Sequence, residues 1–306
     1  MYRILFSLLV VSSIGVSQLF ADAELVHAPE YQKGQVIKTE IETNLEQTLI
    51  IAGMNVETGA ENFLTTEETV KEVTADKAVL GGRFSAILME LKLPGGQSIS
   101  FDSGNPNVEI PPAPFGEVVK FLKMMANSTW TTELDGNRQV TGLKYEDDFL
   151  SKVPDGFKDQ VSQEQRIIDS KTTINRLPGK SVKVGEKWER NEEANLGSGQ
   201  TFYSVREYTY VGPEEHNGKK MEKIKAVTKS IQYDITGGGA LPVELKDSEL
   251  KVKSSEGVLW YDPELKQVVE SSDVTHVVGE LTFVTGGMEL PAKLDLTMKV
   301  KSKNIQ

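Results

Sequence analysis

Hydrophobic and polar residues alternate one by one in two long stretches, one near the beginning of the sequence and one at its end. In the first, Ile37, Thr39, Ile41, Thr43 and Leu45 alternate with Lys38, Glu40, Glu42, Asn44 and Glu46. In the second, Leu294, Leu296, Met298 and Val300 alternate with Asp295, Thr297, Lys299 and Lys301. A period of two with one charged face indicates an antiparallel strand that contacts water on one side.

Further strands are predicted between the turn signals of both halves. In the first half they cover residues 48–51, 62–73, 78–80 and 83–93, followed by a hairpin of 129–134 and 138–143. In the second half they cover 187–190, 201–211, 221–235, 248–254, 257–262 and 268–284. Glycine-rich segments such as 94–96 and 237–239 mark turns. The sequence therefore predicts a mainly β protein.

Two segments have the helical period instead. Residues 115–125 place seven apolar residues on one side and Glu117, Lys120 and Lys123 on the other. The seven are Phe115, Val118, Val119, Phe121, Leu122, Met124 and Met125. Pro114 suits the start of this helix. A second helix is expected after Ser162, which with Gln165 fits a capping box in which both side chains bond to the backbone.

Two short phrases recur at similar spacing and suggest that one β unit is used twice. Gly34 and Gly185 lie 151 residues apart, each before an acid or amide and a strand, and residues 99–102 resemble 259–262. We expect an α+β fold, mainly β, with antiparallel sheets from two similar units. One amphipathic helix per unit, or between them, would cover an apolar sheet face. The first unit spans 24–150, a helical connection 151–180 and the second unit 181–306.

The first 23 residues have the features of a signal peptide. Arg3 precedes the apolar segment 4–16, and Ala21-Asp22-Ala23 has the form of a cleavage site after Ala23. An uncleaved anchor is the alternative, but the apolar segment is short for a membrane span. Residues 24–30 are predicted to be a mobile leader. We therefore expect an exported protein of the periplasm or cell surface, with no transmembrane segment after cleavage.

Composition excludes several classes of site. The chain has no cysteine, so disulfides, thiolate metal sites, cysteine nucleophiles and a lipid on cysteine are excluded. The net charge is −11, and removal of Arg3 with the signal peptide is balanced by removal of Asp22. Nucleic-acid binding requires clustered Lys and Arg, so this acidic balance argues against it.

Histidines and motifs give no catalytic centre. The three histidines are His27 in the leader, His216 at an expected hairpin tip and His276 in a strand. The common hydrolase and metalloprotease motifs are absent, and Gly179-Lys180-Ser181 lacks the upstream glycine of a phosphate-binding loop. No catalytic residue, metal ligand or cofactor is therefore expected. A pair of carboxylates could still support a hydrolase.

The apolar side of the helix at 115–125 gives the functional hypothesis. If this helix covers the sheet incompletely, its seven apolar residues would bind an apolar small molecule or a segment of another envelope protein. If it covers the sheet fully, it is part of the core. The first reading predicts a non-catalytic binding or carrier protein. The alternatives are a structural or interaction component of the envelope and a carboxylate-based hydrolase.

Several phrases resemble a family of exported bacterial proteins, a domain of unknown function that is frequent in planctomycetes. The matching phrases are K-G-Q at 33–35, T-V-K-E-V at 69–73, L-P-G-K-S-V-K-V-G-E-K-W at 177–188 and G-V-L-W-Y-D-P-E at 257–264, together with the middle helices. The resemblance covers most of the chain after the signal peptide. It implies a β-rich fold and the envelope of a Gram-negative-like cell, with the K-x-G-[DE]-x-W turn in a structural role. It implies no activity.

Overall fold

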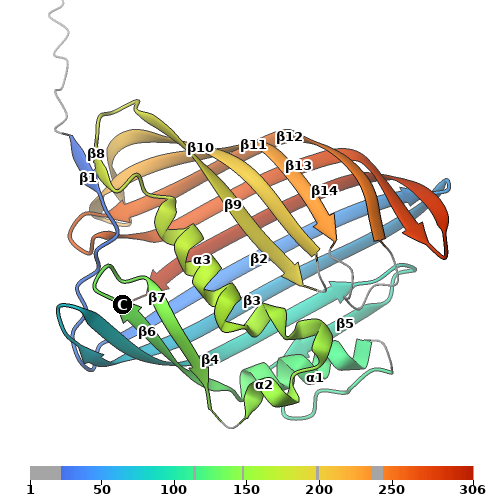
Figure 1. Ribbon diagram of the computed structural model, residues 1–306, viewed down its shortest axis with the longest axis horizontal. Helices are drawn as coiled ribbons and strands as arrows, with labels where there is room; N and C mark the ends of the chain where they lie inside the picture. The colour runs from blue at the N-terminus through green and yellow to red at the C-terminus, as the bar shows by residue number, and fades with distance from the viewer. Residues whose placement is uncertain (1–21, 113–114, 147, 198–199, 236–243, 306) are drawn as a thin grey trace, which may run out of the picture.

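One strongly curved antiparallel sheet forms most of the molecule, and helices lie along its open side (Figure 1). The computed structural model describes residues 22–112, 115–146, 148–197, 200–235 and 244–305. The predictions for the signal peptide up to Ala21, for Pro114 and for the glycines at 237–239 fall outside these residues. The prediction of a mainly β fold with few helices is confirmed.

Two runs of consecutive strands build the sheet. The first run is β2 (Val36–Ile51), β3 (Met54–Val73), β4 (Lys77–Lys92), β6 (Thr129–Asp135) and β7 (Val140–Tyr145), with β5 (Ser98–Asp102) paired to β4 beside it. The second is β9 (Lys187–Gly197), β10 (Gln200–His216), β11 (Lys219–Ile235), β12 (Glu244–Asp262), β13 (Gln267–Thr285) and β14 (Met288–Ile305). The last strand, β14, pairs with the first, β2, so both units belong to one continuous sheet whose edges are β7 and β9.

The alternation in the sequence explains the junction between the runs. Leu45 lies opposite Met298 and Leu49 lies opposite Leu294, so the apolar positions of β2 and β14 share one face. These residues join a large apolar cluster with side chains from β10 to β13. The charged positions lie on the other face, which is the arrangement that a half-wet strand requires.

The helices form one connected group. They are α1 (Phe115–Ala126), α2 (Phe149–Lys152), the 3-10 helices η1 (Asp155–Phe157) and η2 (Asp159–Val161), and α3 (Gln163–Asn175). Helix α3 contacts both edge strands, β7 and β9, and Figure 1 shows it crossing the space between them. It therefore bridges the gap that the curved sheet leaves open. No helix of the described residues is long and apolar enough to span a membrane.

Helix α3 starts as predicted in one respect only. The Ser162 hydroxyl accepts a hydrogen bond from the Gln165 amide at 3.0 Å, which is the expected cap. The predicted return bond from the Gln165 side chain is wrong. That side chain is buried, donates to Asp169 and accepts from Asn195 of β9, so tertiary contacts compete successfully with the local bond.

The prediction of a mobile leader at residues 24–30 is wrong. Ala23–Leu25 form strand β1, which pairs with β8 (Lys180–Val182), and Leu25 is fully buried. Farther along, the Ala28 amide donates to the Lys266 carbonyl at 2.9 Å. The local sequence pattern does not predict this strand, because the segment is short and is held in place by contacts with distant elements.

Candidate functional site: a cavity beneath helix α3

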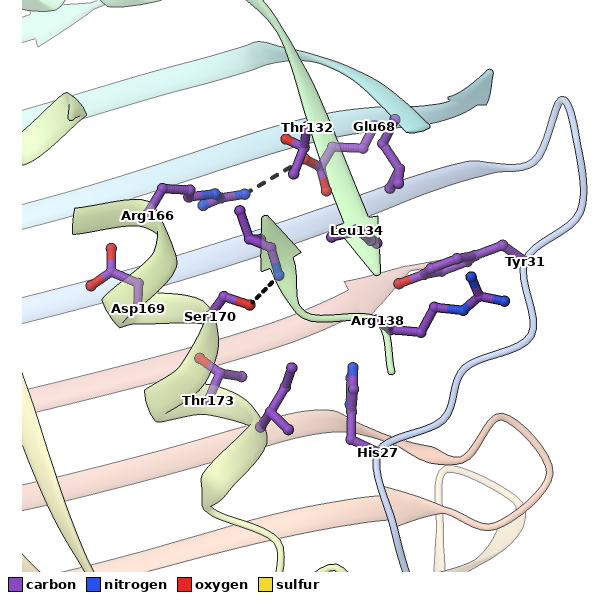
Figure 2. A pocket seen from close by; sticks show the side chains of 13 residues that line it. His27, Tyr31, Glu68, Thr132, Leu134, Arg138, Arg166, Asp169, Ser170 and Thr173 are labelled. Carbon is purple, nitrogen blue, oxygen red and sulfur yellow. Dashed lines mark hydrogen bonds and ion pairs between the residues drawn. The ribbon is translucent and has the colours of Figure 1, made fainter. Parts of the chain in front are cut away.

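A cavity of about 240 Å³ lies between α3 and the inner face of the sheet, the face toward that helix (Figure 2). Strands β3, β4, β6 and β7 and the N-terminal segment complete its lining. Each molecule in liquid water occupies about 30 Å³, so the cavity volume corresponds to roughly eight waters or a small organic molecule.

The sheet supplies most of the apolar lining. Leu80, Leu134 and Val140 come from β4, β6 and β7, and Ile174 comes from α3. Leu134 pairs with Val140 across the β6–β7 hairpin, and all three sheet residues belong to one buried cluster. Period-two burial thus places an apolar patch on one side of the cavity.

Arg138 is the central polar residue of one wall. It follows the turn between β6 and β7 with φ of 62°, a backbone region that a side chain other than that of glycine rarely adopts. Its Nε donates to the Pro29 carbonyl at 3.4 Å, and its guanidinium lies over the Tyr31 ring, 5.5 Å from the centroid. Figure 2 shows His27 and Tyr31 beside it on this wall. Three segments that are distant in sequence therefore converge there.

Helix α3 supplies the opposite wall with Arg166, Asp169, Ser170 and Thr173. The Ser170 hydroxyl accepts a hydrogen bond from the Val140 amide at 3.4 Å. Asp169 accepts from the Gln165 side chain at 2.8 Å. The first contact holds the helix against β7, and the second gives Asp169 a hydrogen-bond partner within the helix.

Glu68 of β3 is the other acid of the cavity. Its carboxylate lies 3.5 Å from the Arg166 guanidinium and accepts a hydrogen bond from the Trp130 indole at 3.3 Å. Both acidic side chains thus have partners of their own. In the described part of the chain, no carboxylate lies within ion-pair distance of Arg138.

Several polar groups of the lining lack a hydrogen-bond partner among the described residues. Arg138 Nη1 and Thr132 Oγ1 are buried atoms with none. No described residue bonds to the Tyr31 hydroxyl or the His27 ring. Buried polar groups are nearly always paired, so these atoms are available to water or to a ligand.

Burial keeps two of these groups neutral. It lowers the pKa of His27 to about 4, so the imidazole is uncharged at neutral pH. Burial, with a smaller contribution from the Glu68 charge, raises the pKa of Tyr31 to about 12, so its hydroxyl keeps its proton. Of the two arginines in the described lining, Arg166 lies within ion-pair distance of a carboxylate and Arg138 does not.

A second cluster of buried polar side chains lies on the inner face, on β9, β10 and β13. Arg206 contacts Asp273 and Glu192, and Glu192 also accepts from the Tyr208 hydroxyl and pairs with Arg176 at 3.1 Å. Each carboxylate here has an arginine partner. The arrangement favours a structural role over an acid and base poised for hydrolysis.

Comparisons with known proteins give weak similarities only. No family model and no curated protein matches the chain. Among solved structures, lipovitellin matches with a TM-score of 0.40 and 10% identity over 90% of this chain, which spans 25% of the lipovitellin chain. An exported protein of YmcC-like fold from Bacteroides fragilis matches with a TM-score of 0.20 and 11% identity, over 89% of this chain and 97% of that one. These scores carry no argument about function.

The seven residues predicted to bind an apolar ligand lie away from this cavity. Val119 and Phe121 are buried, and the other five are half-buried. Most pack in two clusters, one against β4 and β5 and one against α2 and its neighbours, so both sides of α1 are in contact with protein. Met124 lines a separate surface pocket with Phe149.

The residues of the cavity were missed because their sequence neighbourhoods predict other things. His27 stands in the predicted leader, Arg138 at the start of the second strand of a predicted hairpin and Arg166 on the polar side of a helix. A local signal exists only at Arg138, where an arginine follows Asp135-Gly136-Asn137 in a position that favours glycine or asparagine. His216 is at the expected hairpin tip, stacked on Trp260 with 4.0 Å between ring centroids, and His276 of β13 contacts Asp295 of the neighbouring strand β14.

Proposed function

We propose that the protein is a non-catalytic binding or carrier protein of the bacterial cell envelope, and that it holds a small amphipathic molecule in the cavity beneath α3. The proposal moves the binding site from the α1 surface to a place where open volume and unpartnered polar groups coincide. It includes export, with cleavage after Ala23. The N-terminal sequence of protein recovered from the envelope should then begin at Glu24. A signal peptide that is still attached would contradict the export proposal.

One observation carries the proposal. Polar atoms of Arg138, Thr132, Tyr31 and His27 line an open cavity without partners among the described residues. A wall that existed only to fill the core would pair these atoms or replace them with apolar groups, because unpaired buried polar atoms are costly. A small number of polar groups in an otherwise apolar cavity is the usual composition of a ligand site.

The experiment compares two tryptophan variants of α3. Thr173 lines the cavity and is exposed, so Thr173→Trp should block the space without disturbing the core. Lys171 is also exposed on α3 and does not line the cavity, so Lys171→Trp is the matched control. The probes are small amphipathic molecules of up to about ten non-hydrogen atoms, screened by their effect on the melting temperature.

Ligands should raise the melting temperature of the wild type and of Lys171→Trp but not of Thr173→Trp, since only a protein that binds the probe is stabilised by it. Stabilisation of all three proteins to the same extent would place the binding elsewhere. Failure of every probe to stabilise the wild type would contradict a small-molecule carrier.

A further inference from the structure

We propose that the ligand is a small monocarboxylate with an apolar body, and that Arg138 binds its carboxylate. This inference rests on the proposed function and specifies the chemistry of the same cavity. It depends on three features of the lining, namely a guanidinium without a carboxylate partner, acids that are engaged elsewhere and an apolar patch.

The first feature is the state of Arg138. Its Nε bond to the Pro29 carbonyl and its position over the Tyr31 ring hold the guanidinium plane in place. Nη1 is buried and has no acceptor among the described residues. A guanidinium presents parallel N–H donors in a fixed fork that matches the two oxygens of a carboxylate. The missing partner is therefore an acceptor, and an anionic one satisfies both the hydrogen bond and the charge.

The backbone at Arg138 supports the same conclusion. Its φ of 62° is unfavourable for an arginine, and glycine or asparagine would adopt it more readily. Strained residues persist where the surrounding structure over-determines them, often at ligand sites. The position in the turn directs this side chain across Tyr31 rather than into solvent.

The second feature is the engagement of the two acids by groups other than Arg138. Glu68 is engaged by Arg166 and Trp130, and Asp169 by Gln165. His27 and Tyr31 are neutral, and the two arginines and two acids of the described lining balance in number, but Arg138 has no carboxylate within ion-pair distance among the described residues. A single carboxylate would pair with it, whereas a phosphate dianion would bring an additional negative charge into a partly buried space. The Tyr31 and Thr132 hydroxyls are further groups of the lining without a partner among the described residues, and each can donate to a ligand.

The third feature is the apolar patch. Leu80, Leu134, Val140 and Ile174 form the apolar part of the lining. The cavity of about 240 Å³ admits a molecule of roughly ten non-hydrogen atoms. Phenylacetate has this size, one carboxylate and an apolar ring, and phenylacetamide is its neutral analogue of the same shape.

The test is isothermal titration of the full chain after the signal peptide with phenylacetate, phenylacetamide and phenyl phosphate. Variant Arg138→Gln keeps a polar side chain without the charge. Variant Arg83→Gln is the control, because Arg83 is exposed on β4 and pairs with Glu67. Circular dichroism and melting curves of each variant establish that it folds.

We expect phenylacetate to bind the wild type about 10- to 100-fold more tightly than phenylacetamide, the range for a charge-assisted hydrogen bond. Arg138→Gln should remove this preference and leave the affinity for the amide unchanged, and Arg83→Gln should behave as the wild type. Equal binding of acid and amide, or an undiminished preference in Arg138→Gln, would overturn the carboxylate assignment. Tighter binding of phenyl phosphate would overturn the choice of a monoanion.

Failure of this inference can be separated from failure of the proposed function. If the amide binds as well as the acid and Thr173→Trp abolishes both, the cavity is a ligand site of different chemistry. If Thr173→Trp leaves the binding of both compounds unchanged, the cavity is not their site and both proposals fail.

Discussion

Gly34 and Gly185 occupy the same position in two copies of one turn. The Gly34 amide donates to the Val70 carbonyl and the Gly185 amide to the Tyr210 carbonyl, both at 2.8 Å. Their φ angles are 85° and 86°. Each glycine precedes the first strand of its run and is bonded to the second strand, so the phrase that recurs in the sequence has one geometry.

The residue after each glycine closes the turn. The side chain of Gln35 accepts from the Gln32 amide at 3.0 Å, and that of Glu186 accepts from the Lys183 amide at 3.1 Å. Both are side chains with a terminal oxygen, which explains why an amide and an acid are interchangeable here. The turn therefore has a structural role.

Substitution of either glycine by alanine should destabilise the protein by about 1–2 kcal/mol, the cost of a left-handed backbone for a residue with Cβ. No atom lies within 4 Å of a Cβ added at Gly34 or Gly185, so the cost is conformational only. Urea unfolding measures it. Gly142→Ala is the control, because that glycine has no positive φ and its added Cβ would make ordinary contacts. Equal effects of all three substitutions would contradict the assignment.

The protonation of His27 should make stability depend on pH. Its pKa is about 4 in the folded protein and near 6.5 in the unfolded chain. Between these values the unfolded state binds more protons at this group, so the contribution of His27 to stability falls as the pH decreases from about 6.5 to about 4 and is constant below. The loss should reach up to about 3 kcal/mol. The measurement is the free energy of unfolding at several pH values.

Variant His27→Gln isolates this contribution, because glutamine does not titrate. The difference in unfolding free energy between wild type and variant should change over this pH window and be constant above it. Glu68 and Asp169, the acids of the same cavity, remain in both proteins, so their titration cancels in the comparison. A constant difference over the whole range would show that His27 is not buried as a neutral group.

The long elements could be predicted from the sequence, but short strands such as β1 and the long-range partners of all strands could not. The alternation in β2 and β14 predicts both strands, because burial of one face imposes a period of two. That Leu45 lies opposite Met298 depends on curvature of the whole sheet, and no local pattern encodes it. The cavity was missed for the same reason. His27, Arg138 and Arg166 belong to three separate segments, and each segment alone has an ordinary structural interpretation.

Substitutions in helix α1 test the hypothesis that its apolar residues form a ligand site. Phe121 is buried, and its ring stacks on Phe157 with 4.5 Å between centroids. If α1 is a core element, Phe121→Ala should destabilise the protein by about 3–5 kcal/mol. Half-buried Val118 provides the control, and Val118→Ala should cost clearly less. A small loss for Phe121→Ala combined with weaker ligand binding would instead support the original hypothesis.

The contact between Arg206 and Asp273 gives the largest expected loss of stability outside the apolar core. Both side chains are on the inner face, and a Cβ at Gly257 would collide with the Asp273 carboxylate, so the glycine of β12 makes room for the pair. Asp273→Asn leaves the buried guanidinium with Glu192 as its carboxylate partner at 3.6 Å. Removing one partner of a buried pair costs roughly 3 kcal/mol or more, because a charge stays buried without full compensation.

A double variant separates the pair from the cost of the orphaned charge. Arg206→Met with Asp273→Leu removes both charges, and the double variant should be more stable than Asp273→Asn alone. The exposed pair of Lys301 and Glu42, 3.2 Å apart, is the control, and Glu42→Gln should cost less than about 1 kcal/mol. If Asp273→Asn is as mild as Glu42→Gln, water reaches Arg206, and the cluster is not a buried support of the inner face.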